Sequence, residues 1–420
     1  MRRALAGNKS ITAASASNDA AAARITQAKS GLLPKVNYSE AWTRSDNPVF
    51  VFSSLLTQHQ FGEPNFQVGP LNRPEFLNDF QSELTADQPL YDAGKARRAV
   101  HSADLAKDIT SEDVRRTQMD VIASVVRSYH DVQLGTDQLS ATRQTMRSVE
   151  ADLERAESRR SAGMATEADV LSIRVHLAGV HEEQYRRSAD LDVARAALND
   201  ALGLTLDTPH TLAAAMAPLI LPDLTLADYE QEAAHGRPEA HQVRLAKEIA
   251  QTDAAEARGT LLPQVNLHAA FEADRQHFYD RGGANWLVAI GLRWNLFNGF
   301  ADKARIEESQ SSLRRSAAGQ ERADSAIRLQ VRRAWADLRA AEQRIESARA
   351  AQAEAEESLR ISQNRYEAGL NTVTDLLRVE TALLETRTRY LAAVHDQRIA
   401  ATMLEFAAGA LTVDSEVLNQ

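Results

Sequence analysis

Several segments of the chain alternate apolar and polar residues, which is the pattern of a β-strand whose two faces meet different surroundings. The clearest is the segment 285–297, which contains the sequence WLVAIGLRWNLF. The other face of this segment turns polar at Arg293 and Asn295. One face is apolar throughout: Trp286, Val288, Ile290, Leu292, Trp294 and Leu296.

Three weaker segments are also predicted to be strands, at about 34–46, 78–91 and 263–274. Phe271 lies on the apolar face of the third, and Trp42 on that of the first, where Glu40 interrupts the pattern. Each alternating segment is typical either of a strand facing lipid or of a half-buried sheet in a soluble protein.

The spacing of the tryptophans favours the membrane interpretation. Trp286 and Trp294 are eight residues apart, and eight residues of strand span roughly 26 Å. A tilted strand of that length nearly crosses the apolar band of an outer-membrane barrel, where aromatic residues mark both interfaces. We therefore expect Trp42, Phe271, Trp286 and Trp294 to be aromatic residues of the membrane interface.

Long segments between the strands have the period of packed helices. Apolar residues seven apart follow the segments 166–202 and 372–406, as in Val170 and Leu177 or Leu376 and Leu383. Each segment follows another long helical one, at about 95–161 and 301–366. A helix of about 65 residues is roughly 100 Å long. Such rods predict an elongated molecule.

The sequence contains an internal repeat. The phrase Leu-Leu-Pro-x-Val-Asn begins at Leu32 and again at Leu261, after alanine-rich helical segments at about 9–31 and 227–260. A second match follows at an offset of 206, between RRSAGMATEADVL (159–171) and RYEAGLNTVTDLL (365–377). We therefore predict two repeats of helix, strand, strand, long helix and long helix, 1–203 and 227–410. An irregular linker, 204–226, separates the repeats, and a C-terminal tail, 411–420, follows them. The offset between the repeats falls from 229 at Leu32 and Leu261 to 206 in the later match, so the first repeat contains 23 extra residues. We assign these to a long loop, 47–77.

Composition excludes several classes of protein. A net charge of −10 argues against a nucleic-acid-binding protein, which needs a basic surface. A chain without cysteine has no disulfide or thiolate site. The histidines lack metal-ligand spacing, and there is no P-loop, dinucleotide fingerprint or nucleophile elbow, so we expect neither a cofactor nor an enzyme. No apolar run is long enough for a spanning helix. No signal peptide is evident, and the sequence is expected to begin near the mature start.

Strands and rods together constrain the assembly. Four strands cannot close a barrel, and an open sheet edge is not viable in lipid. Three chains would supply 12 strands, enough to enclose a channel, and 12 long helices to extend it.

The chain resembles the TolC-type outer-membrane efflux proteins over its whole length. The duplicated Leu-Leu-Pro-x-Val, the LFNGF junction and the paired AGMATEADVL and YEAGLNTVTDLL turns are similar to that family's signatures. The resemblance implies a mainly α fold with a membrane β-barrel. It implies a homotrimer whose 12-stranded barrel, embedded in outer-membrane lipid, continues as a periplasmic α-helical barrel. It also implies a passive exit duct for a tripartite efflux pump or type I secretion system, docked to a periplasmic adaptor and an inner-membrane transporter of the RND, ABC or MFS type.

The resemblance also places two functional regions. The adaptor would dock on the turns between the long helices, at Gly163, Met164, Ala165 and Thr166 and at Gly369, Leu370, Asn371 and Thr372. The periplasmic gate would involve Asp375, as an acidic ring sensitive to cations, and a link between Tyr366 and Asp169. A helix-surface aspartate near a helix start is the alternative for Asp375. A soluble coiled-coil scaffold or adaptor is the alternative for the whole protein.

Overall fold

The computed structural model describes residues 1–209, 212, 216–220 and 224–419. The chain divides into two compact units. Unit 1 consists of Met1–Ser17, Thr110–Arg244 and Gly319–Gln420, and unit 2 of Asn18–Ile109 and Leu245–Ala318. Both units therefore contain parts of both sequence repeats.

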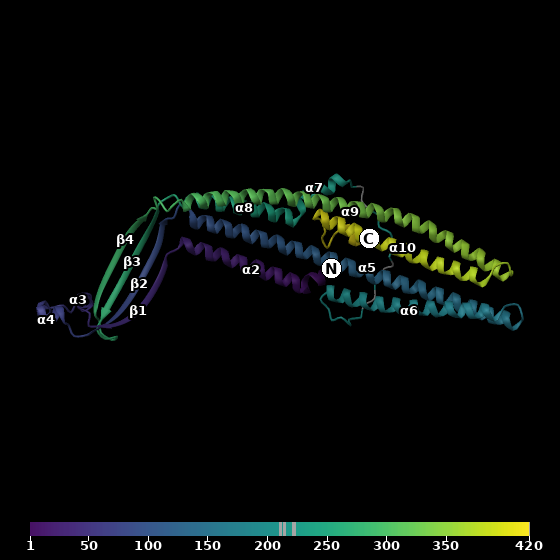
Figure 1. The fold of residues 1–420 in the computed structure, drawn as a ribbon, viewed down its shortest axis with the longest axis horizontal. Coiled ribbons are helices and arrows are strands. Elements are labelled where there is room, and N and C mark those ends of the chain that lie inside the picture. Colours follow the sequence, from purple (N-terminus) through teal and green to yellow (C-terminus); the bar gives the residue numbers. More distant parts are fainter. Residues whose placement is uncertain (210–211, 213–215, 221–223, 420) are drawn as a thin grey trace. The chain divides into compact units, whose positions relative to one another are not determined.

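Unit 2 contains one antiparallel sheet of four strands in the order β1-β2-β3-β4 (Figure 1). The strands are β1 (Lys35–Ser45), β2 (Leu77–Tyr91), β3 (Gln264–Arg275) and β4 (Gly283–Arg293). Each repeat supplies one pair of neighbouring strands, and β2 and β3 join the two pairs from Phe80↔Arg275 to Tyr91↔Val265. The ladder leaves β1 and β4 at the two edges.

The first three strands begin and end within one residue of the predicted bounds, whereas β4 ends four residues before Phe297. The last residue of β4, Arg293, pairs with Gln264, the first residue of β3. Beyond Gln264 the partner would be Pro263, which has no N–H for the ladder. The prediction that the strand continues through Trp294 to Phe297 is therefore wrong.

The segment 47–77 is not the plain loop that the sequence suggested. It contains α3 (Pro48–Thr57), a 3₁₀ turn (Glu63–Phe66) and α4 (Val68–Asn72). Asn47 caps α3, since its side chain accepts hydrogen bonds from the amides of Val49 and Phe50. Pro48 occupies the first helical position, where a missing N–H costs nothing. The prediction of a loop over 47–77 is therefore wrong for this part, where Asn47 and Pro48 begin a helix.

The Leu-Leu-Pro phrases end helices in both repeats, as predicted. In the first, α1 (Arg2–Gly7) and α2 (Lys9–Lys29) precede a 3₁₀ turn, Ser30–Leu32. In the second, the expected single helix is split into α7 (Leu226–Gly236) and α8 (Pro238–Gly259). Arg237 between them is extended, because the residue before a proline disfavours the helical conformation.

The four long helices are α5 (Lys95–Ser161), α6 (Glu167–Ala201), α9 (Ala301–Glu367) and α10 (Val373–Ala408), all within two residues of the predicted bounds. The first turns of α5 and α9 belong to unit 2, and the remainder to unit 1. We call α5 with α6 the first hairpin and α9 with α10 the second hairpin (Figure 1).

The core of unit 1 follows the repeat. Val125 and Leu198 are buried in one cluster, and Val331 and Leu404, 206 positions later, are buried in an equivalent one. Of the predicted heptad residues, Val170 on α6 and Leu376 and Leu383 on α10 are buried, and Leu177 is partly buried. A third cluster lies where the hairpins end, and there Val149 and Ile173 of the first hairpin pack with Val373 of the second.

The predicted linker 204–226 is irregular up to Thr225 where it is described, but 210–211, 213–215 and 221–223 lie outside the described residues. The tail contains a short α11 (Glu416–Asn419), and residue 420 also lies outside them. Among the described helices, none combines the length and apolarity needed to cross a membrane.

Candidate functional site

The turns at the ends of the two hairpins have the same backbone. Gly163 and Gly369 have φ of +73° and +71°, the left-handed conformation that glycine adopts without steric cost. The amide of Met164 donates to the carbonyl of Arg159 at 2.8 Å, and that of Leu370 donates to Arg365 at 2.8 Å. These bonds close a Schellman motif at each tip and satisfy carbonyls that the helix ends leave free.

The returning helices begin with identical capping boxes. Thr166 accepts a hydrogen bond from the amide of Asp169, whose carboxylate accepts one from the amide of Thr166 at 2.9 Å. Thr372 and Asp375 make the same reciprocal pair. The resemblance implies docking turns for the threonines and a gate for the aspartates. Capping already accounts for a carboxylate at both positions.

The electrostatics of Asp375 follow from this cap. Hydrogen bonds from Thr372, first from the hydroxyl and then from the amide, hold the pKa of Asp375 below its usual value. Arg378 lies 3.3 Å from the carboxylate and acts in the same direction. Within one chain, therefore, Asp375 stays ionised to lower pH than an isolated aspartate.

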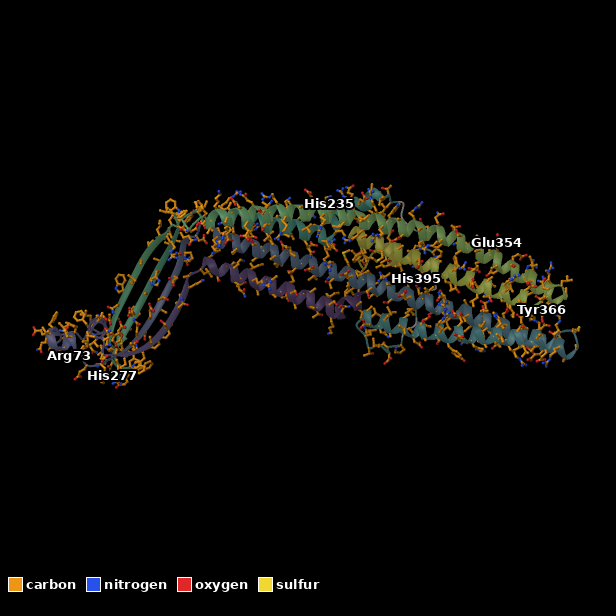
Figure 2. The ribbon with its side chains drawn as sticks, in the orientation of Figure 1. Arg73, His235, His277, Glu354, Tyr366 and His395 are labelled. Carbon is orange, nitrogen blue, oxygen red and sulfur yellow. The ribbon has the colours of Figure 1, made fainter. Side chains whose placement is uncertain are left out.

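The ring of Tyr366, near the end of α9 (Figure 2), packs with Arg159 of the first hairpin. The guanidinium carbon lies 5.3 Å from the ring centroid, and the guanidinium donates to the carbonyls of Tyr366 and Glu367 at 3.1 and 2.8 Å. Asp169 is near enough for its charge to act on the Tyr366 hydroxyl, but its carboxylate oxygen is bonded within the cap. Arg159 thus links the two hairpins at their tips.

Sequence reasoning missed Arg159. The repeat offers a signal, because Arg159 aligns with Arg365 at the end of the matching helix. The equivalent arginines act differently, since Arg365 donates to Asn371 of its own turn at 3.0 Å. Conservation of an arginine between the halves could have marked the position, but not its partner.

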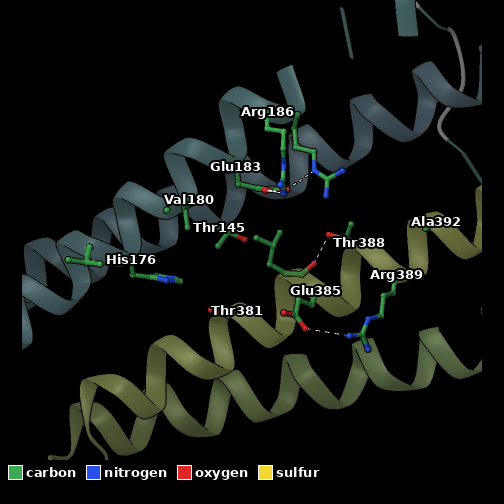
Figure 3. Close-up of a pocket in the computed structure, with 14 residues that line it drawn as sticks. Thr145, His176, Val180, Glu183, Arg186, Thr381, Glu385, Thr388, Arg389 and Ala392 are labelled. Atoms are coloured by element: carbon green, nitrogen blue, oxygen red, sulfur yellow. Dashed lines mark hydrogen bonds and ion pairs between the residues drawn. The ribbon is translucent and has the colours of Figure 1, made fainter. Parts of the chain in front are cut away.

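A groove of about 680 Å³ lies between α6 and α10, further along these helices than the tip turns (Figure 3). His176 and Val180 line it from α6, and Thr381 and Thr388 from α10. Thr145 of α5 forms part of its floor. A smaller groove continues toward the tips and shares His176 and Thr381. No motif in the sequence indicates either groove.

In unit 2, the sheet has one face of exposed apolar side chains. Trp286 is 79% exposed, and Val288, Ile290 and Leu292 follow it along β4, also exposed. Phe271 is the cross-strand partner of Trp286. Trp42 on β1 is exposed as well, and the Trp294 indole, just beyond β4, donates to the carbonyl of Leu261 at 3.0 Å. An exposed apolar face of this extent needs a hydrophobic environment.

Glu40 interrupts this face but does not lie there unpaired. Arg275 of β3 donates to its carboxylate at 2.9 Å, Tyr38 donates at 2.7 Å, and Ser82 donates as well. Arg275 also packs over the ring of Phe278. The polar group is therefore fully hydrogen-bonded, which lowers the cost of a charge on an apolar surface.

The combination of long paired helices and a sheet with one apolar face has a match among known families. The model of a family described as outer membrane efflux protein matches residues 1–204 and 230–410. The chain belongs to the outer membrane efflux protein family. The match covers both sequence repeats and omits the linker.

Individual relatives agree. The chain is 30% identical over 336 residues to protein CyaE of Bordetella pertussis, covering 78% of this chain and 70% of that one. It is 24% identical over 403 residues to the alkaline protease secretion protein AprF of Pseudomonas aeruginosa, covering 91% and 78%. Its fold is similar to that of the outer membrane protein VceC of Vibrio cholerae, with a TM-score of 0.80 at 18% identity, covering 97% and 94%.

The chain is thus an outer-membrane channel protein of the efflux and type I secretion class, with its long helices in the periplasm. This confirms the resemblance, fold class and localisation expected from the sequence. The alternative of a soluble scaffold is set aside. The adaptor-docking, gate and interface roles of individual residues stay predictions.

Proposed function

We propose that three copies of this chain close one 12-stranded β-barrel and form a passive exit duct without catalytic activity or cofactor. Each copy would contribute four strands, with β1 of one chain pairing with β4 of the next. One observation supports this most directly. The sheet has an exposed apolar face, which suits lipid, and two open edges, which are not stable in lipid unless the sheet closes into a barrel.

Mass measurement and conductance test this proposal together. Protein extracted from outer membranes in mild detergent should have the mass of three chains and should lose it on boiling. In planar bilayers it should conduct ions without any energy source. A monomer in detergent, or a trimer that never conducts, would refute the closed-duct assembly.

We further propose that the tips bind a periplasmic adaptor that connects the duct to an inner-membrane transporter of the RND, ABC or MFS type. Met164 and Leu370 occupy equivalent positions after the two tip glycines and are 69% and 68% exposed. Apolar side chains exposed on a rigid turn are suited to contact with another protein. The remaining residues of the docking tips are Gly163, Ala165, Thr166, Gly369, Asn371 and Thr372.

Photocrosslinking in intact cells tests the docking. A photoreactive amino acid at Leu370 should crosslink to a periplasmic adaptor identified by mass spectrometry. The same probe at Arg328, exposed on α9 away from the tip, is the matched control. Equal yields at the two positions, or only crosslinks between copies of this chain, would argue against docking at the tips.

The proposed gate consists of Asp375 with Tyr366 and Asp169. Three copies of Asp375 around one axis would attract cations at the entrance. An Asp375→Asn channel should therefore be less cation-selective in planar bilayers, whereas Glu385→Asn, on an exposed position of α10, should leave selectivity unchanged. Unaltered selectivity in the Asp375 variant would remove the acidic ring from the proposal.

A further inference from the structure

Two carboxyl groups face each other inside the bundle near the tips. Asp152 on α5 and Glu380 on α10 are 2% and 3% exposed, so the pair joins the first hairpin to the second. Ser148 lies 3.5 Å from Glu380 Oε1, and Arg155 pairs with Asp152 Oδ1. The remaining oxygens, Asp152 Oδ2 and Glu380 Oε2, are buried, and no residue outside the pair, among those that the structure describes, makes a hydrogen bond to them.

Charged and titratable groups reach the pair from every helix around it. Arg155 comes from α5 itself, and Tyr366 of α9 is close enough to feel the charge of Asp152. His176 of α6 has its Nε2 3.9 Å from Glu380 Oε2, and that nitrogen is also buried without a partner. One arginine thus faces two carboxyl groups and an imidazole.

We propose that Asp152 and Glu380 share a single proton, and that loss of this proton forces α5 and α10 apart and loosens the contact between the two hairpins. Two carboxylates side by side in a buried site cannot both be ionised without strong repulsion. Arg155 can neutralise only one negative charge. The proton is therefore a structural component of the packed state.

The titration behaviour supports this arrangement. Burial, reinforced by the neighbouring Asp152 carboxylate, raises the pKa of Glu380 to about 9. Burial lowers the pKa of His176, so the imidazole is neutral at pH 7 and does not supply the missing positive charge. Because the folded pKa of Glu380 exceeds its unfolded value, its contribution favours the packed state at low pH and disappears as pH rises through about 9.

The surroundings of the pair explain why its charge state would affect the tip. Val149 and Ala156, one turn on either side of Asp152, are fully buried in the cluster that includes Val373 of the second hairpin. Separation at Asp152 would therefore open an apolar contact as well. His176 is partly exposed and lines the groove between α6 and α10 (Figure 3), which offers protons a route to the pair.

Distance measurements between the hairpins test the proposal. The chain has no cysteine, so spin labels can be attached at Glu154→Cys on α5 and Ala382→Cys on α10, both exposed positions. The label-to-label distance in the wild-type background should lengthen and broaden between pH 7 and pH 10. In Glu380→Gln, which resembles the protonated form, the distance at pH 10 should equal that at pH 7. Glu385→Gln, exposed on the same helix, should respond to pH like the wild type.

Infrared difference spectra provide a second readout that needs no labels. The folded wild type should lose the band of a protonated carboxyl group between pH 7 and pH 10, and part of this loss should be absent in Glu380→Gln. If Glu380→Gln does not fold, Asp152→Asn should shift the loss at Glu380 to lower pH. A wild-type distance that does not change with pH, or a Glu380→Gln variant that responds like the wild type, would overturn the proposal.

These experiments do not depend on the proposed duct. A pH-dependent conductance would follow only if the tips also act as the gate. A separation of the hairpins without any change in conductance would therefore contradict the gate and leave the shared proton in place.

Discussion

Arg159 of α5 lies over the ring of Tyr366 of α9 and donates to the carbonyl of the same residue. One side chain thereby contacts both the aromatic ring of Tyr366 and the carbonyls at the C-terminal end of α9 in the opposite hairpin. Cations at a helix C-terminus are favoured by the helix dipole, so the contact combines three attractive effects.

Loss of this contact should loosen the tips. We expect Arg159→Ala to lower the free energy of unfolding by about 1–2 kcal/mol, from charged hydrogen bonds and the cation–π contact at a partly exposed site. A double-mutant cycle with Tyr366→Leu, measured by thermal unfolding, should show a coupling energy that Arg365→Ala with Tyr366→Leu does not. Additive effects of Arg159→Ala and Tyr366→Leu would mean that the ring and the arginine do not interact.

The capping box at Thr372 should be measurable through its pH dependence. Thr372→Ala should destabilise α10 by about 1 kcal/mol at pH 7, because the cap bond to the amide of Asp375 is lost. The pKa of Asp375 is lowered, so its contribution is present above the unfolded value and is lost as pH falls through the folded value. The gap between wild-type and Thr372→Ala melting temperatures should therefore narrow below about pH 4. Thr374→Ala, at an exposed position two residues later in the first turn of α10, is the control. A gap of constant size would show that Asp375 does not draw its stabilisation from Thr372.

The tip glycines should resist substitution although space surrounds them. Apart from the glycine and its two chain neighbours, no described residue has an atom within 4 Å of a Cβ added at Gly163 or Gly369, so the cost of alanine there is the left-handed backbone, about 1–2 kcal/mol. Gly319, inside α9 and equally uncrowded, should instead gain about 0.5–1 kcal/mol as alanine. Melting temperatures of the three variants test this. Destabilisation by Gly319→Ala to the same extent would point to crowding between chains rather than to backbone strain.

Arg275 should be needed because of Glu40. We expect Arg275→Met to leave the Glu40 carboxylate on the apolar face without its cationic partner, and to reduce the yield of heat-modifiable protein in outer membranes. The cost of such a charge in a barrel reaches roughly 2–4 kcal/mol at mid-membrane and less near the interface. Glu40→Ala combined with Arg275→Met should restore the yield. A double variant as defective as Arg275→Met alone would indicate that Arg275 acts through Phe278 instead.

Periodicity predicted the long helices and the strands closely, because each is specified by many residues along its length. Val170 and Leu376 needed no tertiary information to be placed in a core. The errors occur where a single residue determines whether a helix begins or a strand ends. Pro48 begins a helix that composition suggested was a loop, and Pro263 ends the partner strand before Trp294 is reached.

The site was harder to predict because its contacts join segments far apart in the chain. The glycine and threonine of each tip announce a turn and a cap locally. Arg159 contacts a residue 207 positions away, and Asp152 on α5 faces Glu380 on α10. Neither pairing has a period or a motif in the sequence. The resemblance directed attention to Asp375, which the structure places in a helix cap.

The sheet has a consequence for the ancestry of the chain. One repeat supplies β1 and β2, the other β3 and β4, and only the β2–β3 ladder unites them. A protein of a single repeat would therefore expose β2 as a bare edge, and the equivalent of the β2–β3 ladder would join the second strand of one copy to the first strand of the next. Joining two repeats in one chain makes this junction permanent and leaves each half free to differ from the other. The helical insertion at 47–77 in only one half is a trace of that freedom.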